Sequence, residues 1–177
     1  KNREGEPVHF GPLSGFLPFE TNLLNRRTPL FFNVEKAEDT LYIGRAQVAG
    51  VKILKTMRID PERYLIETTV EVQGAQDEFQ GLTTYLSDQV HKHEGSNFLL
   101  PQFDHQEFFA AAAGSHERWM IRQDEEMNHS LSKVNLVALG SQYFAQAIVD
   151  KSATLPELKV GVDKASDTAL ASVNYSS

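Results

Sequence analysis

The segment His91–Glu94, with the sequence HKHE, contains the residues best suited to holding a metal ion. Its two histidines lie two positions apart and point the same way if the segment is a strand, and imidazole is a common ligand of zinc and copper. A complete site would take further ligands, for which His105 and Glu107 are the candidates. Because the spacing matches no established metal signature, the pattern is more typical of a solvated polar loop, and we predict no metal site.

Acid and base side chains suited to catalysis occur together in Asp104–Glu107 and in Ser115–Glu117. Catalysis needs such groups to converge in one pocket, and exposed or hydrogen-bonded structural histidines are the more common case. Ser141 follows Gly140 but lacks the Gly-x-Ser-x-Gly elbow of a serine hydrolase. The sequence also has no phosphate-binding loop and no Asp-rich calcium loop. We therefore predict no catalytic residue, no cofactor and no enzymatic activity.

Four aromatic residues could line a ligand groove, namely Phe108, Phe109, Trp119 and Tyr143. Aromatic side chains at strand spacing are far more often part of a hydrophobic core. We therefore interpret these residues, and the pair Tyr143-Phe144, as core packing and not as the floor of an active site.

The composition is that of an acidic globular protein. The 177 residues are 41% hydrophobic and 23% charged, and 17 basic against 24 acidic side chains give a net charge of −7. A negative charge of this size opposes binding to nucleic acids and to anionic lipids, so we predict no nucleic-acid partner. The absence of cysteine excludes disulfides and thiol chemistry. No apolar run is long enough to span a membrane.

The length suggests a single domain over residues 1–177. Because the chain begins at Lys1 without a signal peptide and ends at Ser177 in strand-like sequence, we expect a fragment of a longer protein. Glycine and proline recur throughout residues 1–29, which predicts an irregular or edge segment at the entry to the domain.

After this entry segment the pattern predicts about eleven short strands and no helix. The alternation is clearest in residues 64–73, which follow a turn at Asp60–Arg63 and have the pattern of a half-buried antiparallel strand. The stretch Leu131–Asp150 is nearly uncharged and predicts two core strands, covered on both faces, around a turn at Gly140-Ser141. The predicted fold class is all-β.

Two of these segments resemble the large periplasmic domain of the YidC membrane-protein insertase family. Residues 51–72, VKILKTMRIDPERYLIETTVEV, are similar to a family segment in which a Lys-Thr strand precedes a Pro-containing turn, an aromatic residue and an alternating strand. Residues 134–149 resemble a pair of apolar strands that flank an aromatic pair, here Tyr143-Phe144. The order of the segments also fits, so the resemblance covers most of the chain after residue 29.

The resemblance implies an antiparallel β-supersandwich of the galactose-mutarotase kind, with two sheets packed face to face. It also implies a location on the periplasmic side of the bacterial inner membrane. The domain would assist the insertion and folding of membrane proteins as a non-catalytic docking or scaffold module. Components of the Sec translocon and nascent membrane proteins are the implied partners. The insertase activity of the family resides in transmembrane helices, so no active residue is carried over to this chain.

A carbohydrate-binding or aldose-epimerase-like supersandwich is the alternative function. That chemistry needs a histidine acid and a carboxylate base that face each other in a cleft. The only candidates are His105, His116 and Glu107. The two hypotheses therefore differ in whether these residues converge on a concave pocket with an aromatic floor.

Overall fold

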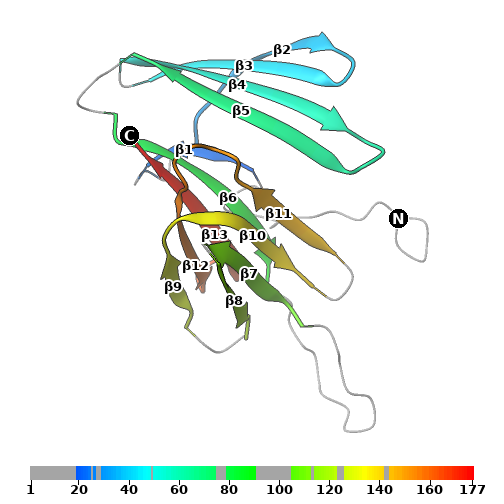
Figure 1. Ribbon diagram of the computed structural model, residues 1–177, viewed down its shortest axis with the longest axis vertical. Helices are drawn as coiled ribbons and strands as arrows, with labels where there is room; N and C mark the ends of the chain where they lie inside the picture. Colours follow the sequence, from blue (N-terminus) through cyan, green and yellow to red (C-terminus); the bar gives the residue numbers. More distant parts are fainter. Residues whose placement is uncertain are drawn as a thin grey trace, which may run out of the picture. The chain divides into compact units, whose positions relative to one another are not determined.

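The computed structural model consists of antiparallel sheets, and it describes residues 19–24, 26, 29–48, 50–74, 79–90, 105–112, 114–122, 126–141 and 144–177. These residues contain strands and no helix, so the all-β prediction is confirmed. The strands are β1 (Thr21–Leu23), β2 (Asn33–Glu38), β3 (Leu41–Val48), β4 (Val51–Asp60), β5 (Leu65–Gln73), β6 (Gly81–Gln89), β7 (Glu107–Ala112), β8 (Ser115–Met120), β9 (Asn128–Leu131), β10 (Val134–Gly140), β11 (Ala145–Val149), β12 (Glu157–Asp163) and β13 (Thr168–Ser176). They form three sheets with the orders β1-β6-β13-β12-β9, β11-β10-β7-β8 and β2-β3-β4-β5 (Figure 1).

The chain divides into two compact units. One contains the strands from β6 to β13, and the other contains β2 to β5. Two compact units can belong to one domain, so the single domain over residues 1–177 stays a prediction.

The unit that contains β6 to β13 is a sandwich with its core between two sheets. Strands β6, β12 and β13 contribute buried side chains from one sheet, and β7 and β10 contribute them from the other. Burial alternates along β7 and along the first half of β12, as expected for strands with one face on a core. The core residues are Leu86, Val90, Phe108, Ala110, Ala112, Val134, Val137, Leu139, Leu158, Val160, Ala169, Ala171 and Val173.

The stretch around Gly140 forms the hairpin β10–β11. The two strands pair antiparallel from Gly140↔Ala145 to Leu136↔Val149, and the Ser141 N–H donates to the Phe144 carbonyl at 2.8 Å. The predicted turn is therefore confirmed. The prediction that both strands are covered on both faces is wrong for β11, because β11 is an edge strand whose residues alternate between exposed and half-buried.

Within residues 1–29, for which an irregular or edge segment was predicted, residues 21–23 form β1, an edge strand of the five-stranded sheet. Thr21 and Asn22 are buried there. The approach to β1 is fixed by the Phe19 N–H, which donates to the Tyr85 carbonyl at 2.7 Å, and by the Tyr85 N–H, which donates to the Glu20 carbonyl at 3.3 Å. A strand of three residues is too short to show a period of two in the sequence.

Candidate functional site

Several residues that the sequence singled out lie outside the described ranges. They are His91–Glu94, Asp104 and Tyr143. The remaining candidates lie in the sandwich unit, around β7 and β8.

Glu107 lies at the start of β7 and forms an ion pair with Arg118 on β8. Arg118 Nη2 donates to Glu107 Oε1 at 2.6 Å, and its Nε donates to Oε2 at 3.3 Å. This side-chain hydrogen bond, together with the carboxylate charge, raises the pKa of Arg118. An epimerase would need Glu107 to face His105 or His116. Among the described contacts, none joins Glu107 to either histidine. The geometry therefore gives Glu107 the role of a cross-strand ion-pair partner.

Gln106 acts as a polar connection between the two sheets of the sandwich. It is 4% exposed, and its Nε2 donates to the Gln89 carbonyl at 3.0 Å and to Asp88 Oδ2 at 3.3 Å. Its own carbonyl accepts from the Ile121 N–H at 2.8 Å. A buried amide needs such partners to offset the loss of water, so Gln106 has a structural role.

The histidines on β8 and β9 pack against aromatic rings. His116 stacks on Phe109 with ring centroids 6.2 Å apart, and His129 stacks on Trp119 at 5.4 Å. Trp119 also packs against the core of the sandwich, and Phe108 is fully buried in it. The core interpretation is confirmed for Phe108 and Trp119.

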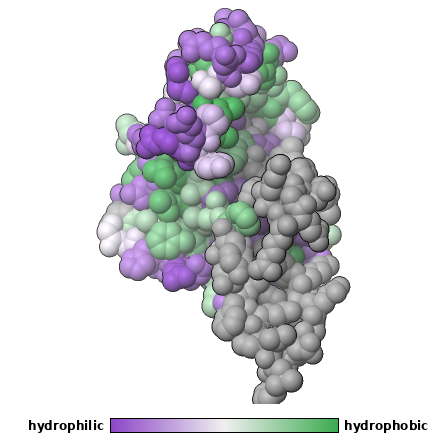
Figure 2. Space-filling model, turned by 90° about the vertical axis from the view of Figure 1, so that its right-hand side faces the viewer, coloured by the Kyte–Doolittle hydropathy of each residue, from purple (hydrophilic) through white to green (hydrophobic). Residues whose placement is uncertain are grey.

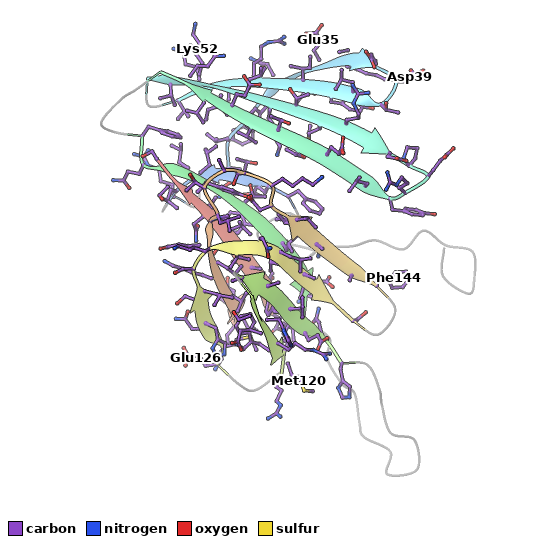
Figure 3. The ribbon with its side chains drawn as sticks, in the orientation of Figure 1. Glu35, Asp39, Lys52, Met120, Glu126 and Phe144 are labelled. Carbon is purple, nitrogen blue, oxygen red and sulfur yellow. The ribbon has the colours of Figure 1, made fainter. Side chains whose placement is uncertain are left out.

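The core interpretation is wrong for Phe144. This residue lies at the β10–β11 turn and is 50% exposed (Figure 3). The strand pattern placed it beside an apolar strand, but its position just before an edge strand leaves half of the residue exposed.

A groove of about 350 Å³ lies between the segment 152–157 and the end of β13 at 174–176. Polar side chains in and beside it, those of Asp150, Asn174 and Tyr175, already bind each other or a neighbouring strand. Tyr175 Oη donates to Asp150 Oδ2 at 2.6 Å, the other Asp150 oxygen accepts from the Ser152 N–H at 2.8 Å, and Asn174 Oδ1 accepts from Thr83 Oγ1 at 2.8 Å. These bonds occupy the polar atoms with partners inside the protein, which favours a structural role for this groove.

We expect Tyr175→Phe to destabilise the sandwich by about 1.5–3 kcal/mol at neutral pH, because it removes a hydrogen bond to a carboxylate. Burial, followed by the bond to Asp150, raises the pKa of Tyr175 well above its ordinary value of 10.0. The folded state therefore retains this proton above pH 10 while the unfolded state loses it, so the stabilisation is complete below pH 10 and declines above it. Urea unfolding of both proteins at a series of pH values checks this. A difference that grows above pH 10 would contradict it.

The unit formed by β2 to β5 is a meander sheet with chemically different faces. The register places Val34, Gly44, Lys55 and Val70 in one row across four strands. Side chains alternate between faces, so the same face also carries Lys36, Tyr42, Ala46, Val48, Val51, Ile53, Met57, Ile59, Ile66, Thr68 and Val72. We call this set of side chains the apolar face.

The apolar face is buried at one end and exposed at the other. Val51 and Ile53 are at most 1% exposed. The exposed members are Val34 at 58%, Ile59 at 36%, Ile66 at 49%, Val70 at 37% and Val72 at 38%. The half-buried prediction for residues 64–73 is therefore wrong, since every residue of β5 is exposed. Green hydrophobic atoms interrupt the purple surface of this unit (Figure 2).

Gly44 and Lys55 shape the middle of this face. A Cβ on Gly44 would lie 3.1 Å from Phe32 Cβ, so glycine lets the phenyl ring lie across β3. The Lys55 ammonium lies 5.7 Å from the centroid of that ring, close enough for a cation–π interaction. Burial lowers the pKa of Lys55. The face therefore combines aliphatic side chains with two lysines, the partly buried Lys55 and the more exposed Lys36.

The opposite face of the same sheet, called the polar face, carries most of the charged side chains beside Leu41, Ile43, Leu54 and Leu65. Arg45 Nη1 lies 3.0 Å from Glu35 Oε2, and Arg58 Nη1 lies 3.9 Å from Glu38 Oε2. Glu35 and Lys52 point to this same side of the sheet (Figure 3). Exposed pairs of this kind contribute little to stability, so their main effect is to keep this face solvated.

Comparisons with known proteins identify no relative. No protein-family model, no curated protein and no solved structure matches the chain. Within the described ranges no group of three or more potential ligands could hold a metal ion. The same part of the chain contains no helix suited to crossing a membrane. The feature that sequence reasoning missed is the exposed apolar face, whose only signal was the alternation in residues 64–72.

Proposed function

We propose that this chain is a non-catalytic docking module that binds protein segments at the β2–β5 sheet. The observation that carries the proposal is the apolar face, with five large aliphatic side chains at least 36% exposed. A solvated antiparallel sheet usually presents polar residues to water. A contiguous apolar surface rimmed by charge marks an interaction site more often than it marks chance exposure.

A protein segment fits this surface better than a small ligand does. Small-molecule sites are concave pockets that enclose most of their ligand, whereas the apolar face is one side of a four-stranded sheet. Extended segments add to such sheets through backbone hydrogen bonds and alternating side chains. The surface chemistry therefore supports a polypeptide partner.

The wider role in this proposal is that of the periplasmic domain of a YidC-like insertase. The support is the sequence of residues 51–72 and 134–149, which form the hairpins β4–β5 and β10–β11. In this role the module docks Sec translocon components or nascent membrane proteins on the periplasmic side of the inner membrane. The parent reading frame is the first check, because an insertase must encode several transmembrane helices beside this domain. A soluble secreted parent would refute the insertase role.

Site-specific photo-crosslinking in inner-membrane vesicles that contain the parent protein tests docking itself. A benzophenone side chain replaces Val34, which projects on the apolar face, or its neighbour Glu35, which projects on the polar face. We expect crosslinks to a Sec subunit or to a ribosome-stalled membrane protein from position 34, at least several times more than from position 35. Equal yields from both positions, or no such product from position 34, would refute docking at this face.

A further inference from the structure

The outer edge of β5 carries backbone groups that no strand of its sheet pairs with. β5 is the last strand of the order β2-β3-β4-β5. The orientation of its groups follows from Ile59, whose N–H donates to the Thr40 carbonyl on the β3 side at 2.8 Å. Backbone groups alternate between the two edges of a strand, so even-numbered residues of β4 face β5. In the register Thr56↔Thr69, the even-numbered residues of β4 lie opposite the odd-numbered residues of β5. The odd-numbered residues of β5 therefore form the backbone hydrogen bonds to β4.

The even-numbered residues of β5 therefore direct their N–H and C=O groups outward. These residues are Ile66, Thr68, Val70 and Val72. Their side chains belong to the apolar face, so a strand added at this edge would extend that face with its own alternate side chains. One added strand thus satisfies the free backbone groups and covers apolar surface.

β5 also lacks the features that protect most edge strands, which are short length, proline, lysine and bulges. Its nine residues, LIETTVEVQ, include neither lysine nor proline, and its register with β4 runs without a shift. The opposite edge, β2, has six residues, contains Lys36 and has a bulge between Lys36 and Glu38. Among the edge strands of the described sheets β5 is the longest. Such an edge is suited to pairing.

Glu67 and Glu71 determine which strand this edge prefers. Both are exposed on the polar face of β5, and no ion pair within the described ranges includes either. A second copy of β5, paired antiparallel about Thr69, would place Glu67 opposite Glu71, and like charges in that position are destabilising. A strand with lysine or arginine there would instead form an ion pair at each position.

We propose that β5 is a strand-addition site for an extended segment in which apolar residues alternate with basic ones. The proposal rests on the docking function above and specifies the partner's chemistry. Backbone hydrogen bonds to the even-numbered residues give affinity, and the two glutamates select basic residues. A neutral or acidic segment would lack the ion pairs with the two glutamates.

The test titrates the full chain into the fluorescent peptide Val-Lys-Val-Thr-Val-Lys-Val and follows anisotropy. The palindromic sequence presents the same side chains in either strand direction. We expect saturable binding that weakens with salt, with slowed amide exchange at Ile66, Thr68, Val70 and Val72. A matched peptide with glutamate in place of both lysines should bind roughly tenfold more weakly.

Two N-methylated peptides separate strand addition from simple side-chain contact. In an antiparallel peptide the valines lie opposite the outward-facing residues of β5, so their N–H groups point at this edge, whereas the lysine N–H groups point away. Methylation of two valine nitrogens should therefore abolish binding, while methylation of the two lysine nitrogens should leave most of it. Equal effects from the two peptides would overturn strand addition.

The protein variant Glu67→Lys/Glu71→Lys should reverse the preference, binding the glutamate peptide more tightly than the lysine peptide. Both positions are exposed, and a circular dichroism spectrum confirms that the sheet is retained. Failure of the lysine peptide to bind, or a dimer through β5 in sedimentation, would overturn the inference. Crosslinks from position 34 would then still support docking at the apolar face. Peptide binding without those crosslinks would instead retain the edge site and remove the docking function.

Discussion

Gly140→Ala is expected to destabilise the sandwich by about 1–3 kcal/mol, because the new methyl group has no space at the β10–β11 turn. Its Cβ would lie 2.8 Å from Ala145 Cβ and 2.9 Å from the Phe144 carbonyl oxygen. That oxygen accepts the hydrogen bond from the Ser141 N–H that closes the turn. Backbone must therefore move, and the closing hydrogen bond weakens. Urea unfolding followed by the fluorescence of Trp119, the only tryptophan in the chain, measures the loss.

The exposed residue Ala145 provides the control for this steric explanation. Ala145→Gly alone should cost about 0.5–1 kcal/mol, because glycine is unfavourable in a strand. In the double variant the Cβ–Cβ clash is gone, so we expect it to lose less stability than the sum of the two single changes. Strict additivity would show that the two positions do not interact and that the cost of Gly140→Ala has another origin.

Local turn chemistry made two hairpins predictable from sequence. The turn at Asp60–Arg63 is confirmed, since Asp60 Oδ1 accepts from the N–H groups of Glu62 and Arg63 at 3.1 Å each. The interruption at Gly140-Ser141 likewise marks the end of β10. In both cases the residues that determine the backbone geometry lie within a few positions of each other, so the sequence contains the complete signal.

The position of each strand in its sheet could not be predicted. A period of two shows which residues share a face, but it does not show what covers that face or which strand lies alongside. The stretch Ala145–Val149 is apolar on both faces, which suggested a central strand, yet β11 is an edge. Residues 64–73 alternate clearly, yet β5 is exposed along its length. Both errors concern sheet order, which depends on contacts between distant parts of the chain.

The same limit explains why the candidate site was missed. The apolar face takes form only when the registers of β2, β3, β4 and β5 align Val34 with Val70, which lie far apart in the sequence. Acidic and histidine clusters were more conspicuous in the sequence. In the structure Glu107 forms an ion pair with Arg118, and His116 stacks on Phe109. Histidine and acidic residues in the sequence therefore did not indicate the apolar face, which is the candidate site in the structure.

Phe108→Ala is expected to have the largest effect of any single change, a loss of about 3–5 kcal/mol, because it leaves a cavity in a close-packed core. Phe108 is fully buried, and its ring lies between the two sheets of the sandwich. It is the cross-strand partner of Trp119, so the fluorescence of that residue reports directly on the site. In chemical denaturation the unfolding midpoint of this variant should lie at a lower denaturant concentration than that of the unchanged protein.

Phe144→Ala is the matched control, since it removes the same side chain from an exposed position. At 50% exposure about half of the residue's surface is buried, and we expect a cost of about 1–2 kcal/mol, well below that of Phe108→Ala. The pair of substitutions also decides between two interpretations of the aromatic residues. If Phe144→Ala cost as much as Phe108→Ala, the aromatic pair at the β10–β11 turn would be core packing after all. A clearly larger cost for Phe108→Ala instead places the core between the two sheets and leaves the turn partly exposed.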